Sequence, residues 1–327
     1  MKFLTIQSNG NSLRCSSLGL GTAKFGVSEL ISDEQCFALL DCFAACGGTL
    51  LDTACVYAQD GSGRSRSEIL LGKWLKSRKE ISGSMVVVTK GGHYDLADPQ
   101  RKARLSEKEL THDLDLSLKN LQTDCIDLYL LHRDDPTLPV EEIIDTLNRF
   151  VRAGKIRCIG ASNWTFERIS EANAYAMRSN QLGFCVSEVG FSLRPGDNGC
   201  SGDPTIPPFD DSEFQKYAGS GIALFAYNAQ ASGFFSRNFH RPDVDIHAPA
   251  PLMRRLHALR RVCAESDLLC EQAVLGYLTS QSIPTAALFS ASTMEHLDAA
   301  LAASDTQLTE KQLRILKQSC GKRTYSS

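Results

Sequence analysis

No apolar run in this sequence of 327 residues approaches the roughly 18–20 residues that a helix needs to cross a bilayer. The sequence also lacks a basic block: 35 Lys and Arg residues stand against 38 Asp and Glu residues, which gives a formal net charge of −3. Binding to nucleic acid or to an anionic membrane depends on clustered positive charge, so we expect neither partner. The first residues, MKFLTIQSNG, turn polar too early for a secretory signal. These absences predict a soluble protein of the cytoplasm.

The 12 cysteines include no C-x-x-C pair and no Cys/His cluster with the spacing of a zinc site. Most of them lie inside apolar periodic segments, as Cys42, Cys46, Cys125 and Cys158 do. In a long chain without a secretion signal, such cysteines are commonly small core side chains. We therefore expect free structural thiols and no metal site.

Short β-rich runs alternate with amphipathic helical runs along almost the whole chain, which gives eight strand-then-helix units. The stretch 3–14 precedes these units and is a possible hairpin. Strands are expected at 16–23, 49–54, 85–92, 125–133, 156–163, 184–192, 221–229 and 285–290. Helices are expected at 32–47, 66–78, 106–121, 140–154, 165–179, 208–220, 252–267, 270–282 and 293–303. Most of the strands are apolar without alternation, which indicates burial on both faces and hence a parallel sheet.

Eight such units without a Gly/Ser linker predict a (β/α)8 TIM barrel of the α/β class, with an N-terminal β-hairpin and a single domain over residues 1–327. The alternative is a doubly wound open sheet, which would need a G-x-G-x-x-G fingerprint after its first strand. The segment GLGTAKFG (19–26) does not have that spacing. We therefore favour the barrel.

Polar residues stand at the carboxyl ends of three neighbouring predicted strands, where the active sites of such barrels lie. Asp52 ends the second strand and Tyr57 follows it, while Lys90 and His132 end the third and fourth strands. Each residue alone is ambiguous, but together they would meet at one mouth of the barrel. We therefore predict that Asp52, Tyr57, Lys90 and His132 form a catalytic group.

The chemistry of these four residues suits the interconversion of a carbonyl and an alcohol. A Lys90 ammonium needs a counter-charge, which Asp52 can supply. Positive charge beside Tyr57 is expected to lower the phenol pKa, so that Tyr57 can donate or accept a proton as the general acid/base. His132 would orient a substrate oxygen towards Tyr57. Because no side chain supplies hydride, a nicotinamide cofactor is implied.

The sequence resembles the aldo-keto reductase family over nearly its full length. The resemblance is carried by LDTACVY (51–57), GRSRSEILLGKWL (63–75), VVVTKGG (86–92), IDLYLLHRDDP (126–136), VRAGKIRCIGASNW (151–164) and FAYNAQASGFF (225–235). It implies a barrel with an N-terminal hairpin that binds NADP(H) without a Rossmann fold. It also implies that Asp52, Tyr57, Lys90 and His132 are the catalytic residues.

The same resemblance implies a set of cofactor contacts. Ser162 and Asn163 match the pair that bonds the nicotinamide carboxamide, and Tyr227 matches the aromatic residue that stacks on the ring. The contacts implied for the pyrophosphate and the adenosine ribose are Asn228, Gln230 and Gly233 in the loop 228–233, together with Ser290, Ala291 and Ser292.

Two positions depart from the pattern of the family. Where the sixth strand often ends in Gln, this chain has Glu188, which as a carboxylate cannot donate to the carboxamide oxygen. Its negative charge would favour the oxidised ring unless a Lys or Arg neutralises it, and both interpretations stay open. In the eighth unit, Ser292 and His296 stand where basic residues are common, and Ala299 and Ala300 replace a Glu-Asn pair. We therefore expect a weakened preference for NADP(H), with NAD(H) as a possible cofactor.

Two other functions stay open. Lys90 could form a Schiff base with a ketone, as in class I aldolases, although Asp52 would keep its amine protonated. A non-catalytic barrel that senses a dinucleotide is the second alternative. For the leading function the expected partner is a small-molecule carbonyl, which can be an aldehyde, a ketone or a sugar. The groups expected around the mouth are Lys24, Phe25, Tyr94, Trp164 and Phe191, together with the loops near 94–105 and 194–208.

Overall fold

Eight parallel strands close into a barrel in the computed structural model, which describes residues 1–8, 10–27, 29–194, 202–241 and 248–318. The barrel strands are β3 (Leu18–Gly21), β4 (Leu50–Asp52), β5 (Val86–Gly91), β6 (Ile126–Leu131), β7 (Ile156–Ser162), β8 (Val186–Gly190), β9 (Ala223–Tyr227) and β10 (Thr285–Phe289). They follow one another around the barrel in sequence order, and β10 closes the ring by pairing with β3. The predicted (β/α)8 barrel is confirmed, and each expected strand is present.

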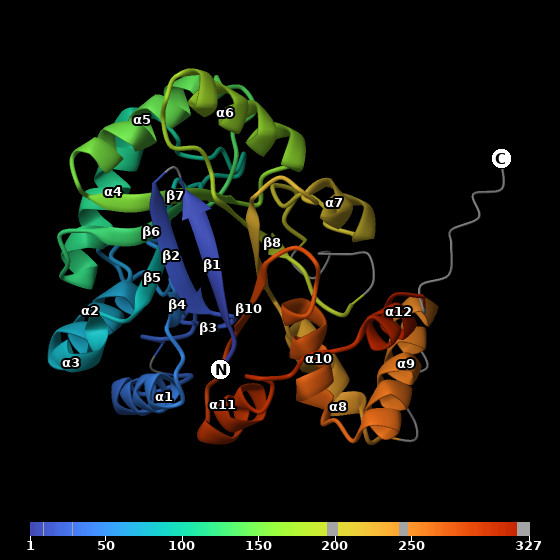
Figure 1. Cartoon of the computed structure of the whole chain (residues 1–327). Helices are drawn as coiled ribbons and strands as arrows, with labels where there is room; N and C mark the ends of the chain where they lie inside the picture. The colour runs from blue at the N-terminus through green and yellow to red at the C-terminus, as the bar shows by residue number, and fades with distance from the viewer. Residues whose placement is uncertain (9, 28, 195–201, 242–247, 319–327) are drawn as a thin grey trace, which may run out of the picture.

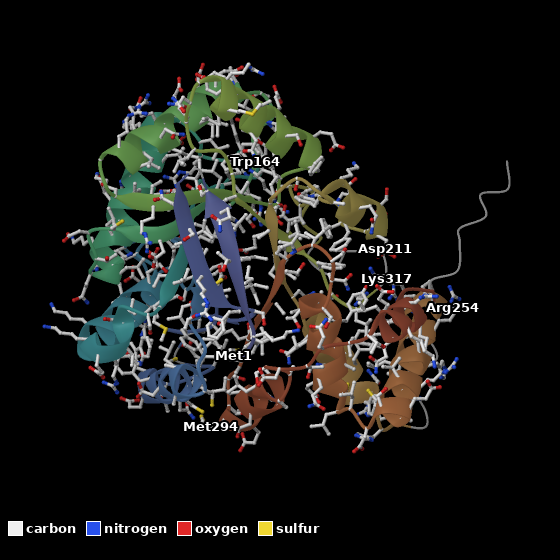
Figure 2. All side chains as sticks on the ribbon, in the orientation of Figure 1. Met1, Trp164, Asp211, Arg254, Met294 and Lys317 are labelled. Atoms are coloured by element: carbon white, nitrogen blue, oxygen red, sulfur yellow. The ribbon has the colours of Figure 1, made fainter. Side chains whose placement is uncertain are left out.

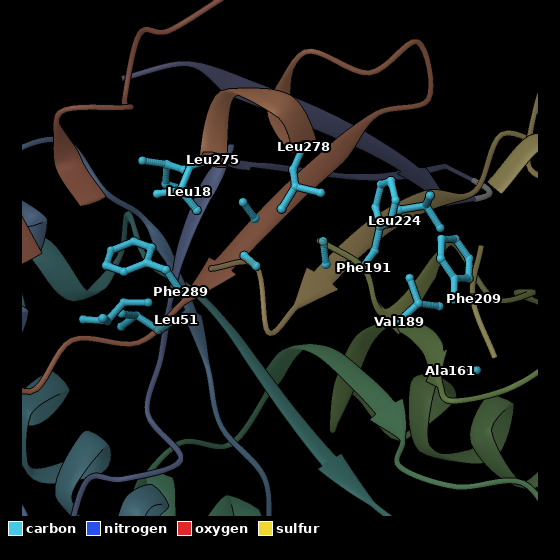
Figure 3. Packing of buried hydrophobic residues seen from close by; sticks show 14 of the residues in the cluster. Leu18, Leu51, Ala161, Val189, Phe191, Phe209, Leu224, Leu275, Leu278 and Phe289 are labelled. Carbon is cyan, nitrogen blue, oxygen red and sulfur yellow. The ribbon is translucent and has the colours of Figure 1, made fainter. Parts of the chain in front are cut away.

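The apolar runs of these strands are buried on both faces of the sheet, as their lack of alternation predicts. In β5, Val86 and Val88 belong to the apolar cluster inside the barrel, whereas Val87 packs outward among the helices. Figure 3 shows part of the outer cluster, to which Leu51 of β4 and Phe289 of β10 belong. Apolar packing therefore holds the strands β4 to β10 from two sides, whereas β3 contributes Leu18 and Leu20 to the outer cluster only.

Helices lie outside the barrel and cover its strands (Figure 1). They are α1 (Asp33–Ala45), α2 (Arg66–Ser77), α3 (Lys79–Ser82), α4 (Glu107–Leu121), α5 (Val140–Arg152), α6 (Phe166–Arg178), α7 (Asp211–Lys216), α8 (Phe234–Asn238), α9 (Ala250–Ser266), α10 (Cys270–Thr279), α11 (Met294–Leu301) and α12 (Glu310–Gln318). Ser32 and Ser106 begin α1 and α4 with capping boxes, in which each serine accepts from the N–H three residues further on. None of the helices in the described ranges is both long and apolar enough to span a membrane.

The helix expected at 208–220 is shorter in the structure, because α7 covers only Asp211–Lys216. Prolines precede it, and Gly219 and Gly221 follow it with positive φ angles of 74° and 78°, which a helix does not allow. The polar helix α12 is not predicted from the sequence, since it has few apolar residues. It packs on α9, and its Lys317 ammonium lies 5.3 Å from the centre of the Phe214 ring of α7 (Figure 2).

A hairpin closes the amino-terminal end of the barrel. Strands β1 (Phe3–Ser8) and β2 (Asn11–Ser16) pair antiparallel, which confirms the predicted hairpin and extends it by two residues beyond 3–14. Its side chains Ile6, Leu13 and Cys15 join the apolar cluster inside the barrel. Figure 1 shows the hairpin lying across this end. Any polar site must therefore lie at the opposite, carboxyl end of the strands.

The cysteines within the described ranges are free, and most of them are buried. Cys15, Cys158 and Cys185 lie in the cluster inside the barrel, while Cys36 and Cys263 lie in the outer cluster. Their surroundings are apolar, as the sequence predicts. Cys200 and Cys320 fall outside the described residues.

Candidate active site

The Lys90 ammonium is the centre of a buried polar group at the carboxyl ends of β4, β5 and β6. Its Nζ atom lies 2.6 Å from Asp52 Oδ1 and donates to the carbonyl of Thr53 at 3.0 Å. A longer contact of 3.5 Å joins Nζ to the Tyr57 hydroxyl. The Tyr57 ring meets the His132 ring edge-on, with 5.8 Å between the ring centres. The structure thus brings the four residues predicted as catalytic together at one mouth.

Backbone hydrogen bonds fix the turn that carries Tyr57. After β4 ends at Asp52, the N–H of Thr53 donates to the Val88 carbonyl and the N–H of Cys55 to the Lys90 carbonyl, so the turn follows β5. The Ser65 hydroxyl then donates to the carbonyl of Tyr57 at 2.8 Å. These hydrogen bonds hold the turn that contains Tyr57 beside β5, the strand that carries Lys90.

The pKa of Tyr57 differs from the sequence-based expectation, which predicted a lowered value beside Lys90. Burial raises the pKa of Tyr57 to about 12, and the negative charges of Asp52 and Glu188 act in the same direction. Lys90 lowers this pKa, but one ammonium does not outweigh burial and two carboxyl groups. The expectation is therefore wrong, and Tyr57 is a protonated phenol near neutral pH.

The charges of Lys90 and His132 follow from the same surroundings. Burial opposes the charge of Lys90, but the attraction of Asp52 and Glu188 outweighs it and raises the lysine pKa. An amine that stays protonated is a poor nucleophile, which disfavours the Schiff-base alternative. Burial lowers the pKa of His132 well below its usual value, and the positive charge of Arg133 adds to this effect. His132 is therefore a neutral imidazole.

Glu188, at the end of β8, reaches the same ammonium. Its Oε1 atom lies 3.3 Å from Lys90 Nζ, and its side chain is almost completely buried. Glu188 does pair with a cation, but it shares Lys90 with Asp52, which lies closer at 2.6 Å, so the pairing leaves the charge of an ionised Glu188 only partly balanced. Burial nevertheless raises the pKa of Glu188 to about 8, with repulsion from Asp52 adding to the rise and Lys90 opposing it.

A cavity of about 440 Å³ lies at this end of the barrel, and we call it the mouth cavity. Of the predicted site residues, those that line it are Asp52, Tyr57, His132, Ser162, Asn163, Glu188, Tyr227, Asn228 and Ser290. Lys90 lies directly behind this lining, bonded to Asp52. Gln230, Gly233 and Ser292 are not part of the lining. The cavity therefore gathers most of the predicted catalytic and nicotinamide contacts on one surface.

Asn163 ties three strand ends together behind the cavity. It has a left-handed backbone conformation, with φ of 61°, and its N–H donates to the Glu188 carbonyl at 3.0 Å. The Tyr227 hydroxyl donates to Asn163 Oδ1 at 2.7 Å, and Asn163 Nδ2 donates to Ser162 Oγ at 3.0 Å. The ends of β7, β8 and β9 thus form one connected polar wall.

The turn after β9 carries three of the predicted contacts, Asn228, Gln230 and Gly233. The side-chain oxygen of Asn228 accepts from the Ser232 N–H at 2.8 Å and holds the turn closed. Gly233 has φ of 73°, and an added Cβ would lie 2.8 Å from Arg237 Nη1. Glycine is therefore favoured at position 233 by the backbone conformation, because the end of the flexible Arg237 side chain could move away from an added Cβ.

The segment from the end of β10 into α11 contains Ser290, Ser292 and His296 and has no Lys or Arg. Ser290 reaches the mouth cavity, while the exposed Ser292 Oγ lies 3.5 Å from His296 Nδ1. The first turn of α11 carries the acidic Glu295 and no Lys or Arg. This part of the site therefore offers one carboxylate and one imidazole instead of a permanent positive charge.

Three side chains expected around the mouth pack elsewhere. Phe25, Trp164 and Phe191 belong to the outer apolar cluster and do not line the mouth cavity. Tyr94 donates to Asp203 beside the mouth, and Lys24 is exposed. The expectation fails for the three aromatic residues because the sequence does not tell which side of a loop faces the helices.

Leu96 and Ile206 confirm that the loops near 94–105 and 194–208 reach the mouth, although residues 195–201 fall outside the described residues. The lining residues that sequence analysis missed are Gly21, Ala23, Val56, His93, Arg133 and Leu288. His93 comes three residues after Lys90, and Arg133 comes directly after His132. Because both stand just beyond the carboxyl ends of barrel strands, their positions in the sequence could have identified them as residues of the mouth. The His93 ring lies 4.7 Å from the His132 ring, and Arg133 is fixed by bonds to Thr205 and Asp203. These residues form the outer part of the cavity.

Two lining residues carry buried polar atoms that have no hydrogen-bond partner, His132 Nδ1 and Glu188 Oε2. Buried polar atoms are normally paired, so this wall fits a ligand that brings its own polar groups. Within the described ranges, no group of three or more His, Cys, Asp or Glu side chains is placed to hold a metal ion.

Comparisons with known proteins agree with this geometry. A family model described as "Aldo/keto reductase family" matches residues 17–320. The norsolorinic acid reductase stcV of Emericella nidulans is 28% identical over 92% of this chain and 77% of its own length. The uncharacterised oxidoreductase YrpG of Bacillus subtilis is 27% identical over 93% and 92%.

The putative aryl-alcohol dehydrogenase AAD14 of Saccharomyces cerevisiae is 26% identical over 96% of this chain and 85% of its own. Among solved structures, the thermostable reductase Tm1743 in complex with the inhibitor epalrestat has a TM-score of 0.72 and 24% identity. The match covers 98% of this chain and 100% of that one. This likeness supports the fold.

Proposed function

This chain belongs to the aldo-keto reductase family, and we propose that its mouth cavity is where it interconverts a carbonyl and an alcohol, with Tyr57 as the proton donor. The reaction type comes from the family and from relatives named as reductases and dehydrogenases. The observation that carries the assignment to Tyr57 is the position of its hydroxyl, 3.5 Å from Lys90 Nζ in the wall of the mouth cavity.

Each of the four residues Asp52, Tyr57, Lys90 and His132 has a distinct role in this proposal. Tyr57, a phenol at neutral pH, donates its proton to the carbonyl oxygen as the alcohol forms. Lys90 stabilises the phenolate that remains, and Asp52 holds Lys90 in place. The neutral His132 hydrogen-bonds the carbonyl oxygen and orients it towards Tyr57. Because the raised pKa of Tyr57 keeps the phenol protonated near neutral pH, the residue is in the form that carbonyl reduction requires, while substrate and cofactor concentrations set the net direction.

A nicotinamide bound here would supply the hydride. The polar wall of Ser162, Asn163, Glu188 and Tyr227 is proposed to hold the nicotinamide half of the cofactor. The proposed contacts to the remainder are Asn228, Gln230, Gly233, Ser290 and Ser292. The unpartnered atoms His132 Nδ1 and Glu188 Oε2 support a polar occupant for this cavity.

We further propose that NAD(H) serves as a cofactor and that the preference for NADP(H) is weak. The first turn of α11 presents Glu295 and His296 where a 2′-phosphate would need Lys or Arg. Losing a charge-assisted contact to a phosphate costs about 1.5–3 kcal/mol of binding free energy. Titration of the purified protein with both cofactors tests this. Binding of NADP(H) that is tighter by about 100-fold or more would contradict it.

The outer part of the mouth cavity favours a carbonyl group on an apolar body. Val56, Leu96 and Ile206 supply apolar surface, and Leu96 is 66% exposed at the rim. Relatives named norsolorinic acid reductase and aryl-alcohol dehydrogenase are consistent with an aromatic substrate. A panel of aromatic aldehydes, ketones and sugars tests this, and the highest kcat/KM is expected for an aromatic carbonyl.

The Tyr57→Phe variant tests the catalytic role and the sensor alternative together. It removes only the hydroxyl, so turnover is expected to fall by at least about 100-fold, while the affinity for the cofactor and the thermal midpoint stay near those of the wild type. Unchanged turnover in this variant would refute the role of Tyr57. A wild-type protein that binds the cofactor but reduces no carbonyl in the panel would favour a sensor.

A further inference from the structure

The carboxyl group of Glu188 has two oxygen atoms with different surroundings. Oε1 lies 3.3 Å from the Lys90 ammonium, Oε2 is buried and accepts from no donor, and the carboxyl group also interacts with that of Asp52. Only 2% of the residue is exposed, and it lines the mouth cavity at the end of β8. Glu188 therefore faces both the catalytic ammonium and the space where a ligand would lie.

The charges around Glu188 nearly cancel without it. The titratable or charged groups that act on it are Asp52 on β4, Tyr57 in the following turn, Lys90 on β5 and Tyr227 on β9, while β7 contributes the neutral Ser162 and Asn163. The ammonium of Lys90 balances the carboxylate of Asp52 at 2.6 Å, and both tyrosines have raised pKa values that keep them neutral. Burial raises the pKa of Asp52 as well, so Asp52 and Glu188 titrate as a pair around one ammonium, and loss of the proton from this pair decides whether the cluster is neutral or carries one negative charge.

This protonation changes within an accessible pH range. Burial and repulsion from Asp52 raise the pKa of Glu188 to about 8, against the opposing attraction of Lys90. Below this pH the carboxyl group is largely neutral, and above it the group is largely ionised. A protonated Glu188 can also donate a hydrogen bond from Oε2, which the carboxylate cannot do.

We propose that Glu188 sets the redox preference of cofactor binding, so that the oxidised nicotinamide binds more tightly relative to the reduced one as the pH rises. The inference rests on the nicotinamide site proposed above. An oxidised nicotinamide ring carries a positive charge and a reduced ring is neutral. An ionised Glu188 in the cavity wall therefore attracts the oxidised ring, whereas a protonated Glu188 does not distinguish the two by charge.

The linkage works in both directions. Because the oxidised ring stabilises the carboxylate, its binding lowers the pKa of Glu188 and releases part of a proton to solvent when the pH lies near or below 8. Binding of the reduced cofactor releases none from this group. The number of protons released on cofactor binding is therefore a second quantity that tests the inference, and its measurement does not require catalytic turnover.

The test measures the dissociation constants of NAD⁺ and NADH from about pH 6.5 to about pH 9.5 for the wild type and for Glu188→Gln. In the wild type, the ratio of the NADH constant to the NAD⁺ constant is expected to rise by about tenfold or more. In Glu188→Gln, which keeps the shape without the charge, the ratio is expected to stay flat. A slope that persists in this variant, or a flat ratio in the wild type, would overturn the inference.

Glu68→Gln is the matched control. Glu68 is likewise buried and has a raised pKa, but it lies outside the barrel and bonds to Thr89 and Asn120. In Glu68→Gln, the ratio of the NADH constant to the NAD⁺ constant should rise with pH as it does in the wild type. If Glu68→Gln abolished the dependence of this ratio on pH, the effect would belong to buried carboxyl groups in general, and the specific role of Glu188 would be refuted.

Calorimetry in two buffers with different ionisation enthalpies measures the proton release at about pH 7.5. Release on NAD⁺ binding is expected in the wild type and not in Glu188→Gln, and equal release in both would overturn the inference. If Glu188→Gln does not fold, the wild-type ratio and proton release alone decide. If neither cofactor binds at any pH, the proposed function fails; if both bind at a constant ratio, only the role of Glu188 fails.

Discussion

At the scale of single residues, the complete burial of the Lys90 charge is the feature with the largest energetic consequence. Lys90 has 0% exposure and depends on Asp52 and Glu188 for its charge balance. Desolvating an ammonium costs several kcal/mol, and the paired carboxyl groups offset this cost. The three residues therefore depend on one another for stability as well as for chemistry.

Replacing Lys90 with Met should leave two buried carboxyl groups without a cation. Breaking a buried pair in this way costs about 3–5 kcal/mol of unfolding free energy. The pKa of each remaining carboxyl group is raised in the folded state, so the loss should be small at low pH and grow as the pH rises. Urea unfolding at about pH 5 and pH 9 measures this.

The double variant Lys90→Met, Glu188→Gln is the control for that experiment. Removing one carboxyl charge should recover part of the stability that Lys90→Met loses at high pH. A single variant as stable as the wild type at both pH values would show that the three charges are not coupled.

The meeting of Asp52, Tyr57, Lys90 and His132 at one mouth of the barrel could be predicted from the sequence, but their electrostatics could not. Asp52, Lys90 and His132 follow recognisable strands, so the barrel topology alone places them at one mouth. The pKa of Tyr57 depends on burial and on Glu188, which comes from a strand about 130 residues further along the chain. No local pattern reports that Glu188 and Asp52 share one ammonium.

At the scale of single elements, strands are easier to predict than helices in this chain. A strand buried on both faces is a short apolar run, and each such run forms a barrel strand. The bounds of the helices are harder to predict, because tertiary contacts decide where each helix begins and ends. α12 is polar along its length and packs against α9, whereas α7 stops before two glycines that follow Tyr217.

The capping box of α4 offers a test of one element. Ser106 accepts from the Glu109 N–H, and Glu109 accepts from the Ser106 N–H, at an exposed helix start. Ser106→Ala should lower the unfolding free energy by about 1 kcal/mol, because the Glu109 N–H loses its acceptor, the Ser106 hydroxyl. Ser106→Thr keeps the cap and should retain most of the stability. Catalytic turnover should not change in either variant, and a loss of turnover would contradict a purely local role.

At the scale of the whole molecule, we propose that the hairpin and the barrel unfold as one unit. Ile6, Leu13 and Cys15 of the hairpin pack in the same cluster as the inward residues of the barrel strands, so neither part has a separate core there. Differential scanning calorimetry should give one transition, with equal calorimetric and van't Hoff enthalpies. A separate early transition that Ile6→Ala shifts alone would contradict this.

The hairpin that covers one end of the barrel also separates two tasks in space. Apolar side chains fill the covered end, and the strand ends and loops at the other end carry the polar residues of the mouth cavity. Changes in the loops around Leu96 and Ile206 can therefore alter the substrate without disturbing the strands beneath them. The barrel is a scaffold on which new specificities can evolve at one end while the other end stays unchanged.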